Sequence, residues 1–215
     1  MRPGRAEYLA DGAVHAAALL GAGLAGVTLV RLVPLGERPD LAAALLVYLT
    51  PMLGLAVAST LYNLRPGASA SSFFQRLDHA CIYLMIAGTY TPFCLFVIPP
   101  PWGVGLLATV WSLALAGAGL RLGGWAMPDR VATWLYLAKG WLVLLVLPLL
   151  LANLSGSGLL LLLIGGVLYS AGVVFYRWHG LPFRRAIWHG FVFGAATCHF
   201  FAIVHGVVLA DIRPA

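Results

Sequence analysis

Charged residues are scarce in this sequence. Asp, Glu, Lys and Arg together make up only 9% of its 215 residues, whereas 61% are hydrophobic and the mean hydropathy is +0.93. Soluble globular domains have about 25% charged residues, so this composition excludes an ordinary soluble domain. The sequence therefore predicts an integral membrane protein, for which the lipid bilayer is the first partner.

Cysteine, lysine and polar linkers are also scarce. Cys81, Cys94 and Cys198 all lie in apolar segments, so we do not expect a disulfide framework. The only lysine, Lys139, lies in the fifth apolar stretch, which excludes a retinal protein with a Schiff-base lysine in its last helix. The first residues lack the apolar core of a cleavable signal peptide. We expect one domain over residues 1–215 that keeps its first helix.

Seven apolar stretches are long enough, or nearly so, to cross a bilayer, which takes about 20 residues in a helix. Segments rich in proline, glycine or serine separate them, as expected for loops between helices. The sequence therefore predicts an all-α membrane protein with a seven-transmembrane helix bundle. We expect the spans near residues 13–33, 41–62, 79–98, 103–120, 132–152, 158–176 and 187–209.

Arginines are distributed unevenly between the two sides of this predicted bundle. The positive-inside rule places the arginine-rich side in the cytoplasm, so we predict a cytoplasmic N-terminus and an outside C-terminus in the cytoplasmic (inner) membrane. This orientation argues against a G-protein-coupled receptor, and it explains the pI near 9.6 without nucleic acid as a partner. The N-terminal side carries Arg2, Arg5, Arg65, Arg76, Arg121, Arg130, Arg177, Arg184 and Arg185, and the other side carries Arg31, Arg38 and Arg213.

Polar residues gather at the predicted cytoplasmic ends of four helices, and several are spaced four apart, which puts them on one helical face. Such residues cost roughly 2.5–3.5 kcal/mol each at the centre of a span. They indicate either a functional site or a polar network that closes the bundle. The predicted cluster contains Glu7, Asp11, His15, Ser59, Asn63, Asp78, Arg185 and His189.

Two further polar residues lie within the predicted spans, Lys139 near the cytoplasmic start of the fifth and His199 deeper in the seventh. We expect Lys139 to have a structural role and to extend its ammonium group to the membrane interface. His199 lies ten residues beyond His189, or about 15 Å further along the same helix. We expect it to be neutral and hydrogen-bonded across helices.

Three sequence blocks resemble the bacterial hemolysin III proteins, within the progestin and adipoQ receptor family. They are RLDHACIYLMIAGTYTPF at residues 76–93, AIWHGFV at residues 186–192 and CHFFAI at residues 198–203. For related receptors and alkaline ceramidases, the resemblance implies a seven-helix bundle with a zinc ion near the cytoplasmic side. Three histidines hold that ion, and an aspartate on the third helix holds a water molecule.

The zinc-binding pattern of the family is incomplete in this sequence. Ser59, Asp78 and His189 match the serine, the aspartate and the second histidine of the seventh-helix pair. Asn63 and Arg185 stand where the other two histidines belong. An amide is a poor substitute for imidazole, and a guanidinium stays protonated and has no lone pair to offer.

Two hypotheses follow for the missing ligands. Arg185 supplies the positive charge that zinc supplies in relatives, by pairing with Asp78, Asp11 or Glu7. Alternatively, zinc binds through a shifted set of ligands. That set consists of Asp78, His189, His15 and Asp11.

Two functions remain open from the sequence. The first is a membrane protein that senses or adjusts the state of the membrane, with the polar cluster as a structural or regulatory element and a lipid as its ligand. The alternative is a zinc-dependent lipid amide or ester hydrolase, with Asp78 assisting a metal-bound water and Ser59 as the donor that stabilises the oxyanion or orients the ligand. No charged stripe lines any helix as a conduction path would require, so only the family name implies cytolysis.

Overall fold

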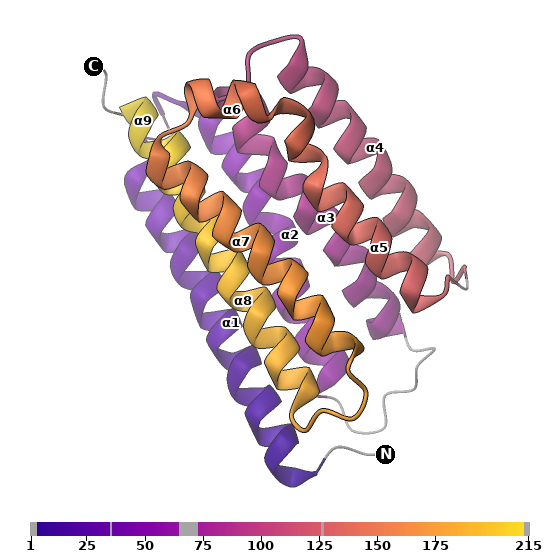
Figure 1. The fold of residues 1–215 in the computed structure, drawn as a ribbon. Helices are drawn as coiled ribbons and strands as arrows, with labels where there is room; N and C mark the ends of the chain where they lie inside the picture. The colour runs from indigo at the N-terminus through magenta and orange to yellow at the C-terminus, as the bar shows by residue number, and fades with distance from the viewer. Residues whose placement is uncertain (1–3, 35, 65–72, 126, 213–215) are drawn as a thin grey trace.

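A computed structural model describes residues 4–34, 36–64, 73–125 and 127–212 of the chain. These residues form helices and connecting turns, with no strand among them, as predicted (Figure 1). The elements are α1 (Arg5–Leu32), α2 (Pro39–Asn63), α3 (Phe73–Phe96), α4 (Trp102–Leu122), α5 (Asp129–Gly140), the 3-10 helix η1 (Trp141–Val146), α6 (Leu147–Asn153), α7 (Gly156–Arg177), α8 (Arg184–Ile203), the π-helix η2 (Val204–Val208) and α9 (Leu209–Ile212).

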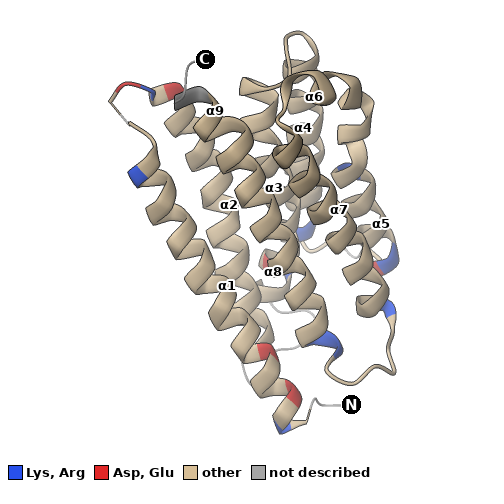
Figure 2. Cartoon of the chain, turned by 60° about the vertical axis from the view of Figure 1, so that its left-hand side comes forward, with Lys and Arg blue, Asp and Glu red and all other residues tan. Residues whose placement is uncertain are grey.

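Seven helical segments are long and apolar enough to cross a membrane, which confirms the predicted seven-span bundle. Residues 129–153 form one span from α5, η1 and α6, and residues 184–208 form another from α8 and η2. Helix α1 begins at one end of the bundle, and α9 lies at the other (Figure 1). Charged residues lie mostly toward the two ends (Figure 2). We call the end where α1, α3, α5 and α8 begin the N-terminal end.

Two helices begin much earlier than the sequence predicts, by eight and six residues. Helix α1 starts at Arg5 and α3 at Phe73, whereas the apolar runs suggested starts near residues 13 and 79. An apolar run does not include a polar first turn, although the helical backbone begins there. In α1 the Glu7 Oε2 atom accepts a hydrogen bond from Gly4 N at 3.2 Å, which satisfies a backbone donor at the start of the helix. Asp78 therefore lies inside α3 rather than at its mouth, and it is buried.

The fifth span is broken, although the sequence suggested one continuous helix. Pro148 has no N–H to donate and its ring crowds the preceding turn, which disfavours a regular α-helix there. The Tyr90 hydroxyl forms hydrogen bonds with the backbone at this break. It donates to the Gly140 carbonyl oxygen at 2.7 Å and accepts from Val143 N at 2.8 Å. Lys139 is buried beside this break and donates to the Tyr83 carbonyl oxygen at 2.6 Å. The prediction that Lys139 reaches the interface is wrong.

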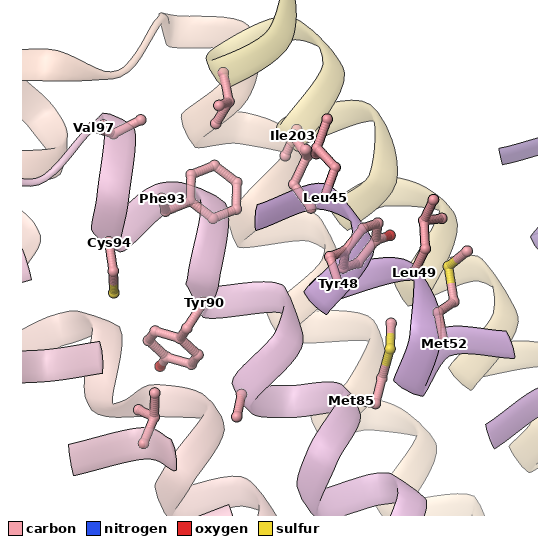
Figure 3. Packing of buried hydrophobic residues seen from close by; sticks show 14 of the residues in the cluster. Leu45, Tyr48, Leu49, Met52, Met85, Tyr90, Phe93, Cys94, Val97 and Ile203 are labelled. Atoms are coloured by element: carbon pink, nitrogen blue, oxygen red, sulfur yellow. The ribbon is translucent and has the colours of Figure 1, made fainter. Parts of the chain in front are cut away.

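The core is centred on α2 and α3. Figure 3 shows Tyr48 and Met52 of α2 beside Met85 of α3. The two helices approach closely because Gly88 has no side chain: a Cβ there would meet the ring of Pro51 at 2.8 Å. This close pair provides a rigid wall beside which the polar residues of α2 and α3 are held.

Candidate functional site

A compact group of three side chains joins α1 to α8. His189 Nδ1 donates to Asp11 Oδ1 at 2.6 Å, and His15 Nδ1 lies 3.6 Å from the same oxygen. The rings of His15 and His189 meet edge to face, with centroids 4.4 Å apart. Asp11 and His15 are four residues apart and therefore share one face of α1. Both are buried, so little solvent screens this acid from its two histidines.

Ser59 connects this group to α2 and α3. His15 Nδ1 donates to the Asp11 carbonyl oxygen at 2.8 Å, which leaves His15 Nε2 as an acceptor for the Ser59 hydroxyl at 3.3 Å. Asn63 Nδ2 donates to Ser59 Oγ at 3.2 Å, and the Asp78 carboxylate lies beside the same hydroxyl. Four helices therefore contribute to one polar network, as the spacing of these residues suggested.

Two members of the predicted cluster lie outside this network. Glu7 Oε1 accepts from Phe183 N at 2.9 Å and fixes the turn before α8. Arg185 is exposed and forms no hydrogen bond or ion pair with any of the three acids, although the structure describes all four residues. His189, one turn further along α8, takes the place beside Asp11. The predicted pairing of Arg185 with Asp78, Asp11 or Glu7 is not formed.

The family's zinc positions do not fit a metal ion in this chain, because Asn63 is bonded to Ser59 and Arg185 offers no lone pair. Three of the four residues of the shifted set fit better, whereas Asp78, the fourth, is not part of their group. Asp11, His15 and His189 each have a potential ligand atom, and these atoms all lie within 4.8 Å of one another. Two imidazoles, one carboxylate and an open position form the donor set of many catalytic zinc sites, where ligand atoms lie roughly 3.5 Å apart. A bound ion would draw the three side chains closer together.

The polar network forms one end of a cavity of about 760 Å³. This volume is within the range of about 300–1,000 Å³ that is usual for small-molecule pockets. Polar lining at this end includes His15, Ser59, Asn63, Asp78, Arg185 and His189. Apolar lining includes Ala18, Ile82, Ile86, Leu137, Val192 and Phe193.

The sequence did not single out the polar residues on the opposite wall of this cavity. Arg121 and Tyr136 line it from α4 and α5, and Arg121 is buried. Arg121 was treated as a loop cation because the apolar run was expected to end at residue 120, whereas α4 continues to Leu122. The only feature of the sequence that could have indicated a buried Arg121 is its position directly after the end of that apolar run.

His199 confirms the expectation of a hydrogen bond across helices. Its Nε2 lies 3.3 Å from the Leu162 carbonyl oxygen of α7. Because a carbonyl can only accept, Nε2 carries the proton in this contact. The ring also fills the space beside Gly165, where a Cβ would collide with it. His199 lines the cavity away from the polar end and is not part of the three-residue group.

Comparisons with known proteins support the likeness seen in the sequence blocks. The family model described as "Haemolysin-III related" matches residues 8–200. "Hemolysin-3" of Bacillus cereus is 37% identical over 205 residues, which cover 94% of this chain and 92% of that protein. "Hemolysin-3 homolog" of Bacillus subtilis (strain 168) is 40% identical over 153 residues, covering 71% and 72%. "Monocyte to macrophage differentiation factor" of Homo sapiens is 32% identical over 131 residues, covering 60% and 54%. No solved structure gives a significant match.

Proposed function

Because the chain belongs to the haemolysin-III related family, we propose that it binds a membrane lipid inside its helix bundle and thereby senses or adjusts the state of the membrane. The observation that carries this proposal is the cavity, whose walls are mainly apolar and whose charged side chains gather at one end. A lipid has the same division into apolar chain and polar head. Binding would transfer apolar surface between two apolar environments, so the polar end would decide which lipid is held.

The polar network is proposed as the regulatory element of this activity. It ties α1 to α8 through Asp11 and His189, and to α2 through His15 and Ser59. A headgroup that competes for these hydrogen bonds would change how the helices are held. A metal ion held by Asp11, His15 and His189 would keep them fixed.

Tryptophan at position 18 is expected to remove the bound lipid. Ala18 lines the cavity, whereas its neighbour Ala17 is exposed and does not. An indole at position 18 would fill space that an acyl chain needs, so Ala18→Trp protein should purify with far less lipid than wild type. Mass spectrometry of lipids retained after detergent purification measures this. Ala17→Trp is the matched control, and equal lipid retention by all three proteins would rule the proposal out.

A second candidate function is zinc-dependent hydrolysis of an amide or ester bond in the bound lipid. It is favoured by Asp78 and Ser59, which lie beside the three-residue group. Zinc, when bound, would polarise a carbonyl and make bound water acidic. In this reaction the Asp78 carboxylate would accept the proton of an attacking water, and the Ser59 hydroxyl would donate to the substrate oxygen. Free fatty acid released by wild type but not by Asp78→Asn would favour this function over binding alone.

The orientation of the bundle is part of the proposal. Nine arginines on the N-terminal side against three on the other favour a cytoplasmic N-terminus in the inner membrane. A fluorescent protein that matures only in the cytoplasm, fused before Met1, should then be bright. A dark fusion with an active periplasmic reporter at the same position would reverse the assignment.

A further inference from the structure

Arg121 has charged donors that nothing in the described structure satisfies. It lies in the last turn of α4, is only 8% exposed, and lines the cavity. Its Nη1 lies 3.4 Å from the Met127 carbonyl oxygen, a long contact. Its Nε and Nη2 are buried and have no hydrogen-bond partner among the described residues. A guanidinium stays protonated and cannot reduce this cost by losing its charge, so the site requires an acceptor.

No Asp or Glu among the described residues forms an ion pair with Arg121. Asp129, at the start of α5, lines the same cavity but is exposed and forms no ion pair with Arg121. Lys139 is buried in α5 but is not part of the cavity lining, and its Nζ lies 5.7 Å from the centre of the Tyr83 ring. That ring also fills the space beside Gly117, one turn before Arg121 on the same face of α4. Asp78, the buried acid of this cavity, forms no ion pair with Arg121 either, so the buried guanidinium makes this part of the cavity attractive to an anion.

The surroundings of Arg121 suit an anion that carries an apolar chain. The Tyr136 hydroxyl lies beside the guanidinium and donates to the His79 carbonyl oxygen at 3.2 Å. Leu137 lines the cavity one residue further along α5, and Ile82 and Ile86 line it from α3. The charged side chains of the lining therefore gather at the N-terminal end, and the rest of the cavity is lined mainly by apolar residues, with single polar side chains such as Ser170, Thr197 and His199.

We propose that Arg121 binds the phosphate of an anionic lipid whose acyl chain occupies the cavity. The inference rests on the proposed lipid-binding function and specifies the class of ligand. Nε and Nη2 form one edge of the guanidinium, and this edge can donate two parallel hydrogen bonds to two oxygens of one phosphate. Anionic phospholipids of the bilayer carry this group, and basic pockets between membrane helices are known to bind it. Free phosphate offers the same oxygens without the chain.

The test compares one ligand that has both a phosphate and acyl chains with a ligand that lacks the phosphate and with one that lacks the chains. Full-length protein in neutral detergent is titrated with dioleoyl phosphatidic acid, dioleoylglycerol and inorganic phosphate, and binding is followed by thermal shift and by native mass spectrometry. Wild type should prefer phosphatidic acid to dioleoylglycerol by about tenfold, the usual effect of charge-assisted hydrogen bonds. Arg121→Gln should lose this preference but still bind dioleoylglycerol, and Arg121→Lys should keep part of it.

Arg130→Gln is the control, because Arg130 is an exposed cation at the same end that does not line the cavity. It should keep the wild-type preference. Without added lipid, Arg121→Gln should be at least as stable as wild type, since it removes a buried, unpaired charge. A clear loss of stability in that state would show that Arg121 is structural and overturn the proposal.

The remaining outcomes separate this inference from the function on which it rests. Equal binding of phosphatidic acid and dioleoylglycerol by wild type, or an unchanged preference in Arg121→Gln, would overturn the Arg121 site and leave lipid binding intact. Binding of neither lipid would overturn the proposed function itself. Inorganic phosphate that binds as tightly as phosphatidic acid would show that the ligand is a free anion and not a lipid.

Discussion

Asp11→Asn is expected to reduce zinc affinity by more than about 100-fold, because even partners outside the ligand set commonly contribute 10–100-fold. The asparagine oxygen can still accept a hydrogen bond from His189 Nδ1, so the helices should stay together. It cannot supply the anionic ligand that a divalent ion needs beside two imidazoles. Zinc titration of metal-free protein with a chelating dye in competition measures the change.

The controls for this prediction are the two residues at the family's zinc positions. Asn63→Ala and Arg185→Ala should bind zinc about as well as wild type, since neither side chain is among the three potential ligands. Arg185→Ala should bind slightly more tightly, because it removes a like charge near the ion. A loss of zinc binding in either control, with Asp11→Asn unaffected, would show that zinc binds at the family positions and not at the three-residue group.

Gly103→Ala is expected to destabilise the bundle by about 3 kcal/mol, at the upper end of the usual cost of overpacking. A Cβ at Gly103 would press on the carbonyl oxygens of Cys94 and Ile98. These are backbone atoms near the end of α3, so they cannot swing aside as a flexible side chain would. Helix α4 would have to move away from α3 and would carry Arg121 with it. Thermal unfolding in detergent measures the effect.

Gly105→Ala is the matched control for this steric prediction. It lies two residues further along the same helix, and a Cβ there would meet nothing within 4 Å. Alanine is the better helix former by about 1 kcal/mol, so this variant should be equally stable or slightly more stable than wild type. Similar losses in both variants would mean that α4 does not pack against α3 as described.

The sequence was sufficient to predict the seven spans and most of the polar network. Apolar runs of bilayer length predict the spans, and spacing by four puts Asp11 with His15, and Ser59 with Asn63, on shared faces. Which residue of α8 contacts Asp11 depends on how far each residue lies along its helix from the N-terminal end of the bundle. Asp11 lies six residues, or about 9 Å, beyond the start of α1.

Depth along α8 explains why Arg185 was wrongly paired. It lies one residue beyond the start of α8, whereas His189 lies five residues, or about 7.5 Å, beyond it and so matches the depth of Asp11. These depths require the true starts of the helices, which hydropathy placed several residues too late on α1 and α3. The same error at the end of α4 hid Arg121, whose unpaired donors become visible only when its neighbours are known.

The most direct test of the claim that the polar network can hold a metal ion is zinc-edge X-ray absorption of the purified wild-type protein after zinc loading, with the metal content measured on the same sample. We predict about one zinc ion per chain, bound by two imidazoles and by oxygen, as Asp11, His15, His189 and water would provide. A protein that retains no zinc, or a spectrum that requires three imidazoles, would contradict this site.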